Sequence, residues 1–203
     1  MTDRNRFNPP PPERRKEASV TAFKKFYRIH SWAVYRACLL DPDGIDADHA
    51  PDLDDAELGA AAREALLASR FIGPDHPDWD RVDAFWKNLP DRELLDRFMT
   101  RAGVKTHGAL YSGVGEVGLT LKNGVISLRP MKYEGRGGFT SLRCVELTDL
   151  PESVSDEALG AETRRLVEIS RKPWKWWTPP RNREDMPCFR RRHIIDRPIS
   201  EKR

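Results

Sequence analysis

The sequence has no long apolar run and few cysteines. No stretch of the 203 residues approaches the roughly 20 consecutive apolar residues of a membrane-spanning helix, and the first residues lack the apolar centre of a secretory signal peptide. The three cysteines, Cys38, Cys144 and Cys188, are far apart and form no Cys-x-x-Cys pair, which argues against a disulfide framework and a zinc site. These absences predict a cytoplasmic protein with reduced cysteines and no membrane contact.

Recognisable catalytic patterns are also missing. The five histidines are isolated, so no two of them have the spacing that places metal ligands on one helix face. Gly113, Gly115 and Gly118 form a Gly-x-Gly-x-x-Gly string, but they lie before or within a predicted strand, whereas a dinucleotide-binding loop must open a helix. The sequence therefore predicts a binding protein without enzymatic activity, metal or cofactor.

Charge is distributed unevenly along the chain, although the net charge is only +3. Residues 1–28 carry 8 Lys/Arg against 3 Asp/Glu, residues 171–203 carry 11 against 4, and the stretch between them carries 16 against 25. An acidic central region thus lies between two basic ends. Within it, residues 41–57 contain eight carboxylates and no Lys or Arg, which fits either a solvated loop or a surface that attracts a cationic partner.

The two ends of the chain also differ from the middle in composition. Residues 1–18 include four consecutive prolines and several charged side chains, which predicts a disordered extension. Residues 172–203 form a basic tail rich in Trp, Arg and Pro. Either its tryptophans cover an apolar surface of the domain, or they stack on unpaired bases while Lys and Arg bind phosphates. Residues 19–171 remain as the folded domain.

Asn123 and Gly124 predict a β-hairpin over residues 117–129, because this pair favours a two-residue type I′ turn. The turn places Leu121 opposite Ile126, and the pairs further along the hairpin also match apolar with apolar and hydroxyl with hydroxyl. Residues that face each other in an antiparallel pair share one side of the sheet, so the register set by the turn agrees with the register set by burial.

Further elements are predicted on either side of the hairpin. Aromatic and β-branched residues over 20–40 indicate one or two strands, and residues 139–147 indicate another. Asp54 and Glu57 have capping-box spacing at the start of a helix that reaches about Arg70, and Ser155 caps a last helix. Two more helices, over 78–88 and after Pro90, have apolar stripes that are assigned to the core: Trp79, Val82, Phe85 and Trp86 in the first, and Leu94, Leu95, Phe98 and Met99 in the second.

The first and last of these helices resemble each other. Residues 58–70 and 159–171 are identical at six of thirteen positions, 101 residues apart, and both have a glycine near the start. A helical glycine costs about 1 kcal/mol relative to alanine, so Gly59 and Gly160 are each expected to lie close against a sheet or against the other helix. The predicted fold is α+β: an antiparallel sheet packed with helices, two pseudo-repeated strand-helix halves, and basic N- and C-terminal extensions.

Four segments between residues 52 and 171 have an order and a spacing that are typical of a known family. They are Glu57-Leu58-Gly59 with Ala65-Leu66 and Ser69-Arg70-Phe71, Gly103-Val104-Lys105-Thr106 with Ala109-Leu110-Tyr111, Gly124-Val125-Ile126-Ser127-Leu128-Arg129-Pro130, and Leu159-Gly160-Ala161. In this spacing the chain resembles the contact-dependent growth inhibition (CDI) immunity proteins of Gram-negative bacteria. It departs from the family pattern at two places. Ala102 and Val104 flank Gly103 where the family has aromatic residues, and Tyr133 lies near the place where the family has a histidine after the Arg-Pro strand.

The resemblance implies a cytoplasmic, non-enzymatic immunity protein that neutralises the C-terminal toxin domain delivered by a neighbouring cell, through stoichiometric occlusion. The toxin is expected to be a nuclease. In relatives with nuclease toxins, a toxin hairpin is received against the immunity protein's sheet, a mode that uses unpaired backbone groups at a strand edge. The matching region here is the strand over 139–147 with the connector before it, which assigns toxin binding to Lys132, Tyr133, Glu134, Arg136, Arg143 and Glu146.

A different function stays open beside this one. The protein would bind single-stranded nucleic acid through the basic Trp-rich tail over 172–203, and nucleic acid is expected as a partner only through that tail.

Overall fold

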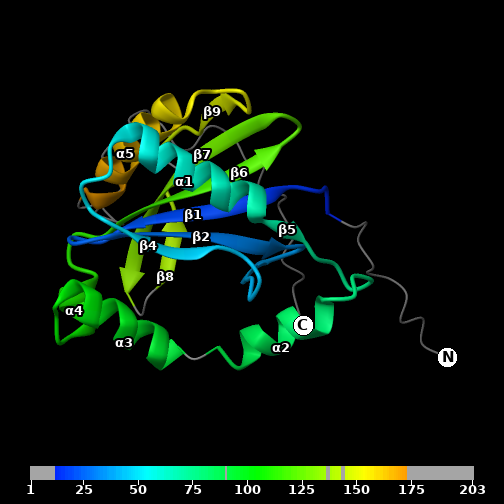
Figure 1. Ribbon diagram of the computed structural model, residues 1–203, viewed down its shortest axis with the longest axis horizontal. Helices are drawn as coiled ribbons and strands as arrows, with labels where there is room; N and C mark the ends of the chain where they lie inside the picture. Colours follow the sequence, from blue (N-terminus) through cyan, green and yellow to red (C-terminus); the bar gives the residue numbers. More distant parts are fainter. Residues whose placement is uncertain (1–11, 90, 136–137, 143–144, 173–203) are drawn as a thin grey trace, which may run out of the picture.

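An antiparallel sheet with helices on both sides forms the centre of the molecule (Figure 1). The structure, a computed structural model, describes residues 12–89, 91–135, 138–142 and 145–172. Helices α1 (Asp55–Ala68) and α5 (Asp156–Arg171) cover one face of the sheet, and α2 (Trp79–Lys87), α3 (Asp91–Ala102) and α4 (His107–Leu110) lie on the other side. The predicted α+β class with an antiparallel sheet is confirmed.

The main path of the sheet has the strand order β3-β2-β1-β6-β7-β8 and curls into a half-barrel. Strands β4 and β5 also pair with β2, and β9 pairs with β7; of these pairings only that of β5 is parallel. The strands are β1 (Lys16–Ala22), β2 (Tyr27–Val34), β3 (Cys38–Leu40), β4 (Asp46–His49), β5 (Arg70–Phe71), β6 (Gly115–Lys122), β7 (Val125–Gly135), β8 (Gly138–Ser141) and β9 (Thr148–Pro151).

The element order is similar on the two sides of the β1–β6 pair. In the first half, β1 and β2 pair, β4 adds to β2, and α1 follows. In the second half, β6 and β7 pair, β9 adds to β7, and α5 follows. The two hairpins meet where β1 pairs antiparallel with β6, so both helices arrive on the same face of the sheet.

Helices α1 and α5 touch each other at their glycines. A Cβ atom on Gly59 would lie 1.8 Å from the backbone oxygen of Asp156, and one on Gly160 would lie 1.8 Å from that of Asp55. No side chain fits at either position, which confirms the predicted close approach and identifies the other helix as the neighbour. Capping also agrees with prediction, because the capping box of Asp54 forms at α1 and Ser155 caps α5.

Two ion pairs related in the same way join these helices. Arg63 Nε lies 2.6 Å from Asp156 Oδ1, and Arg164 Nε lies 2.6 Å from Asp55 Oδ1. The first guanidinium also donates to the carbonyl oxygens of residues 152 and 154, and the second to that of Leu53. Each arginine therefore fastens its own helix to the backbone that enters the other one.

The core between the sheet and these two helices is apolar. It contains alternate residues of β1, β2, β6 and β7, as expected because successive side chains of a strand point to opposite faces. Its least exposed large side chains include Ile29, Leu58, Leu66, Leu119, Ile126, Leu128, Leu159 and Leu166.

The predicted hairpin is confirmed in turn and register. Asn123 and Gly124 have φ angles of 52° and 75°, the left-handed conformation that a type I′ turn requires. Leu121 faces Ile126, and the pairs at 120/127 and 119/128 also follow the prediction. Gly103, with φ of 66°, ends α3 as expected.

The predicted bounds of several strands need correction. Residues 16–18 were assigned to the N-terminal extension, but β1 begins at Lys16, because β1 pairs with β6 as far as that residue. The strand over 139–147 is wrong beyond Ser141: Leu142 still donates its N–H to the Pro130 carbonyl, but Val145 donates to the Leu142 carbonyl, and Thr148–Pro151 form a separate strand, β9. Residues 20–40, predicted to form one or two strands, contain the end of β1 and the whole of β2 and β3.

The assignment of the apolar stripe of α2 to the core also needs correction. Val82 is 1% exposed, but Trp86 is 42% exposed and Trp79 and Phe85 are half-buried. Helix α2 packs beside β3 at the end of the sheet, where the apolar cluster is small. One side of the helix therefore covers this cluster, and the rest of the stripe stays exposed or half-buried. The extensions over 1–11 and 173–203, and with them the Trp-rich tail, lie outside the described residues.

Candidate functional site

The face of the sheet turned away from α1 and α5 is polar and lines a half-open cavity of about 400 Å³. It is built from the strand positions that alternate with the apolar core positions. Aromatic side chains from the segments beyond the sheet complete its walls. The cavity residues used below are Glu17, Ser19, Thr21, Phe23, Arg28, His30, Trp32, Phe98, Tyr111, Glu116, Arg129 and Phe139.

Glu116, at the start of β6, is buried in this cavity with only 7% of its surface exposed. Its Oε2 accepts a hydrogen bond of 2.7 Å from Thr21 Oγ1 on the neighbouring strand. Burial raises the pKa of the Glu116 carboxyl to about 7, because removal from water disfavours the charged form, and the Thr21 hydrogen bond and the charge of Arg28 offset this only in part. A carboxyl with this pKa gains or loses its proton near neutral pH.

His30, on β2, is the second buried polar side chain of the cavity, with 2% of its surface exposed. Neither of its ring nitrogens has a hydrogen-bond partner among the described residues. Burial, together with the positive charges of Arg28 and Arg97, holds the pKa of His30 well below its usual value. The neutral ring packs against Trp32 with 4.5 Å between centroids, and its donor and its acceptor both stay unused within the domain.

The acidic segment over 41–57 is largely engaged within the molecule. Arg70 donates to Asp41 and Asp78 at 2.7 Å each and to Asp43 at 2.8 Å, while Arg81 also binds Asp43. On the other side of this segment, Arg28 and Arg97 bind residue 46. The segment is therefore neither a solvated loop nor an open anionic surface, since arginines distant in sequence neutralise most of the charges described above.

Strand β8 forms an edge of the sheet. It pairs with β7, through Lys132 opposite Thr140 and Tyr133 opposite Phe139, and no other described strand pairs with it. Leu142 donates its N–H to the Pro130 carbonyl, so the antiparallel pattern turns the backbone groups of Phe139 and Ser141 away from β7. Within the described part of the chain, this edge therefore has N–H and C=O groups without a strand partner next to the cavity.

The structure places the six sequence-predicted toxin-binding residues in different surroundings. Lys132, Tyr133 and Glu134 belong to β7 itself, which continues to Gly135, so the predicted connector starts too early. Tyr133 is half-buried: it stacks on Tyr111 with 4.4 Å between centroids, and the two rings are nearly parallel. Its hydroxyl lies 3.4 Å from the Nδ1 atom of a histidine at position 107.

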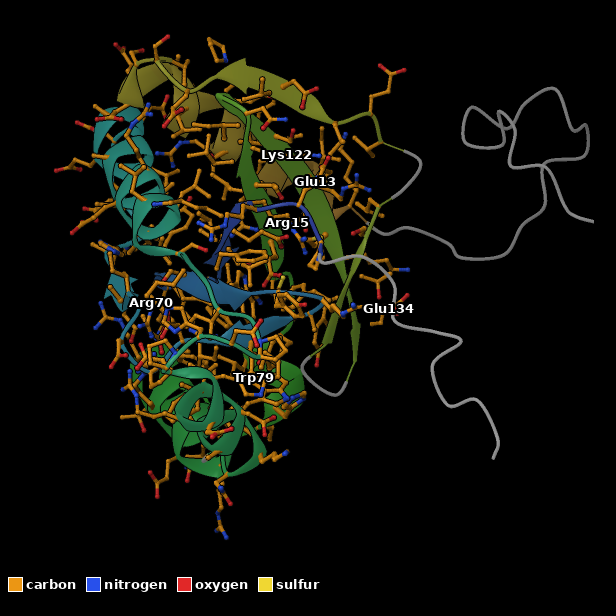
Figure 2. All side chains as sticks on the ribbon, turned by 90° about the vertical axis from the view of Figure 1, so that its right-hand side faces the viewer. Glu13, Arg15, Arg70, Trp79, Lys122 and Glu134 are labelled. Atoms are coloured by element: carbon orange, nitrogen blue, oxygen red, sulfur yellow. The ribbon has the colours of Figure 1, made fainter. Side chains whose placement is uncertain are left out.

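The remaining predicted residues lie toward the same edge or outside the description. Glu134 is exposed and accepts a 2.7 Å hydrogen bond from Thr140 on β8; Figure 2 shows it near the end of the hairpin, on the opposite side of the view from the cyan helix α1. Glu146 is exposed in the segment between β8 and β9. Arg136 and Arg143 lie outside the described residues.

Sequence reasoning missed Glu116 and His30. Each lies at a polar position within a strand whose alternate residues are apolar, and this pattern is also that of an ordinary solvent-facing strand. The pattern could show that this face is polar, but only the curl of the sheet and the aromatic walls make it a buried site.

The described residues lack two other kinds of feature. They contain no group of three or more His, Cys, Asp or Glu side chains able to hold a metal ion. Among the same residues, none of the helices combines the length and the apolar composition that a bilayer crossing requires.

Comparison with known proteins identifies the family. The model of the CDI immunity protein family matches residues 16–170. Immunity protein CdiI-YPIII of Yersinia pseudotuberculosis serotype O:3 is 28% identical over 162 residues, which cover 72% of this chain and 90% of that protein. A chain of the solved CdiA-CT/CdiI toxin and immunity complex from Yersinia pseudotuberculosis aligns with a TM-score of 0.67 and 26% identity, over 78% of this chain and 98% of that one.

A protein of unknown function from Neisseria meningitidis shares the fold, with a TM-score of 0.68 at 22% identity over 83% of this chain and 99% of its own. The family match covers β1 to α5, which is the whole α+β domain described above. On this evidence, the chain belongs to the CDI immunity protein family.

Proposed function

We propose that the protein binds a cognate CDI toxin domain in the cytoplasm and neutralises it by stoichiometric occlusion, with no catalysis of its own. The observation that carries this proposal is the family match over residues 16–170, which includes every described strand and helix. The likeness to a chain of a solved toxin and immunity complex supports it. Occlusion requires a surface that can hold another polypeptide, and the β8 edge is suited to that task.

The proposed contact is addition of a toxin strand to β8. Backbone groups of Phe139 and Ser141 would pair with the incoming strand, and main-chain hydrogen bonds of this kind give affinity while side chains select the partner. The side chains proposed to contact the toxin or to support that contact are Lys132, Tyr133, Glu134, Arg136, Arg143 and Glu146. Tyr133 takes the supporting part, because its ring stacks on Tyr111.

We further propose that the toxin is a basic protein such as a nuclease. Residues 29–170 carry 25 Asp/Glu against 16 Lys/Arg, and an acidic inhibitor competes with the phosphates that a nuclease normally binds. Since the pairs of the 41–57 segment are internal, the attraction would come from exposed carboxylates near the edge, such as Glu134 and Glu146.

Nucleic-acid binding through the tail stays a prediction of the sequence, because residues 173–203 lie outside the described part of the chain. Salt separates the two functions. Binding of nucleic acid weakens steeply between low and moderate salt, since counterions are released, whereas a protein complex with a buried centre is less sensitive.

Growth rescue tests the proposed function. The toxin domain encoded beside this chain is expressed with and without the full chain, and the purified pair is analysed by calorimetry. We expect restored growth and one immunity protein per toxin domain. Arrested growth in the presence of well-expressed immunity protein, or no measurable complex, would contradict the proposal.

A further inference from the structure

The polar cavity holds two buried side chains whose binding capacity the domain does not use. Glu116 receives one hydrogen bond, from Thr21, and His30 receives none among the described residues. Buried polar atoms are paired in most native structures, because leaving one unpaired costs stability. At about 400 Å³ the cavity is within the range of roughly 300 to 1,000 Å³ in which proteins hold small ligands, so it has room for an incoming side chain.

Among the described residues, Glu116 has no direct counter-ion. Arg28 is the cation that acts on its pKa, but its Nε is already bound to Asp46 at 2.7 Å and its guanidinium lies over the ring of Phe98 at 4.9 Å. On β1, Glu17 is paired with Arg15. The titratable or charged groups that line the cavity around Glu116 are Arg28 and His30 on β2, Glu17 on β1, Cys38 on β3, Arg129 on β7 and Tyr111 after α4.

The walls add a second preference. Phe23, Tyr111 and Phe139 line the cavity together with Trp32. Aromatic rings attract cations through their negative faces, and a carboxylate among such rings is a favourable site for an ammonium or guanidinium group. The neutral imidazole of His30 adds a hydrogen-bond acceptor for the same group.

We infer that this cavity receives a lysine or arginine side chain of the toxin domain, which binds Glu116 and His30 and completes the inner face of the sheet. The inference rests on the proposed function and names the chemistry of its contact. The cavity lies beside β8, since Phe139 and Ser141 both line it and belong to the open edge. A strand added to β8 would therefore carry side chains at the mouth of the cavity.

Binding of a cation should release a proton from Glu116. The pKa of the free carboxyl is about 7, so about half of the molecules are protonated at pH 7, and an inserted cation favours the ionised form. Toxin affinity should therefore fall by up to about tenfold for each pH unit below 7.

Calorimetry of the full chain with its toxin domain tests this inference, in two buffers of different ionisation enthalpy at pH 7. We expect release of about half a proton per complex. Glu116→Gln keeps the size and the Thr21 contact but cannot ionise, so it should abolish the release and weaken binding by about thirtyfold or more. The control is Glu64→Gln, the same change at an exposed position on α1, and it should behave as wild type.

Alanine scanning of the toxin's lysines and arginines identifies the inserted residue. Its substitution should abolish the proton release, and it should cost less affinity against Glu116→Gln than against wild type. The proton release measured with the toxin variants tests the inference even if Glu116→Gln does not fold. A tight complex without Glu116-dependent proton release, or with no such toxin residue, overturns the inference while the proposed function stands, and indicates a cavity filled by water. No complex at all overturns both.

Discussion

The two faces of the sheet differ in how fully their groups are used. On the face covered by α1 and α5, apolar side chains fill the core, Gly59 meets Asp156, and Arg63 joins the two helices. On the other face, Glu116 and His30 are buried beside a cavity and retain unused hydrogen-bonding capacity. A closed face of this kind sets the stability of a domain, whereas an open one offers binding energy to a partner.

Adding a side-chain atom at the contact between α1 and α5 should have the largest effect on stability. Gly160→Ala places a Cβ where the Asp55 carbonyl oxygen lies 1.8 Å away, so the helices must separate. We expect a loss of about 3 kcal/mol or more in the free energy of unfolding, measured in urea. Gly108→Ala is the control, because a Cβ there meets no atom within 4 Å and should leave stability nearly unchanged. Equal stability of the two variants would contradict the tight helix contact.

The polar face should make stability depend on pH. The folded pKa of Glu116 is about 7, against an ordinary value of 4.5. Between these values the folded state keeps a proton that the unfolded state has lost, so the contribution is fully present below pH 4.5. Glu116 alone should therefore lower the free energy of unfolding by about 3 kcal/mol as the pH rises to 7, while His30, whose pKa is lowered, contributes in the opposite direction.

Urea unfolding from pH 4.5 to pH 8 checks this prediction. Relative to wild type, Glu116→Gln should gain about 3 kcal/mol in the free energy of unfolding between pH 4.5 and pH 7, while Glu64→Gln, exposed on α1, should follow the wild-type profile. Parallel profiles for wild type and Glu116→Gln would show that the carboxyl is hydrated and that the two faces differ less than described.

The β8 edge should matter for binding and not for folding. Ser141→Pro removes an N–H that points away from β7, so toxin affinity should fall by about tenfold, which corresponds to roughly one hydrogen bond, with little change in stability. Titration calorimetry with the toxin domain measures the loss. Ser141→Ala keeps the N–H and separates the effect of the hydroxyl, and it should lose less. Undiminished affinity of Ser141→Pro would rule out strand addition at this position.

Charge at the edge should have the smallest effect. Glu134→Lys should slow association with a basic toxin by a few-fold, mainly at low salt, because exposed charges steer the encounter. Stopped-flow measurements at two salt concentrations check this. Glu64→Lys, on the helix-covered side, makes the same charge change away from the edge. A similar slowing by both variants would point to net charge alone.

Features set by near neighbours were predictable from the sequence. Asn123 and Gly124 determine a turn between adjacent residues, and Asp54 caps its own helix, so no distant contact was needed to expect them. The close packing at the glycines of α1 and α5 was also predictable, because a glycine lowers the stability of a helix and its presence there indicates a steric requirement.

Features set by distant partners were not predictable. Residues after Ser141 have the composition of a strand, but β8 ends there, and Val145 donates its N–H to the Leu142 carbonyl instead of pairing with β7. Trp86 has helical spacing with its neighbours, yet α2 lies at the end of the sheet. Burial of Glu116 depends on the curl of the whole sheet, which no local pattern records.

Hydrogen–deuterium exchange of the full chain, alone and with its toxin domain, tests most directly whether the open face is the binding face. The toxin should slow exchange in β8, residues 138–141, and in the strand segments around Glu116 and His30, and it should leave α1 and α5 unchanged. Protection confined to α1 and α5, with β8 unaffected, would contradict the account.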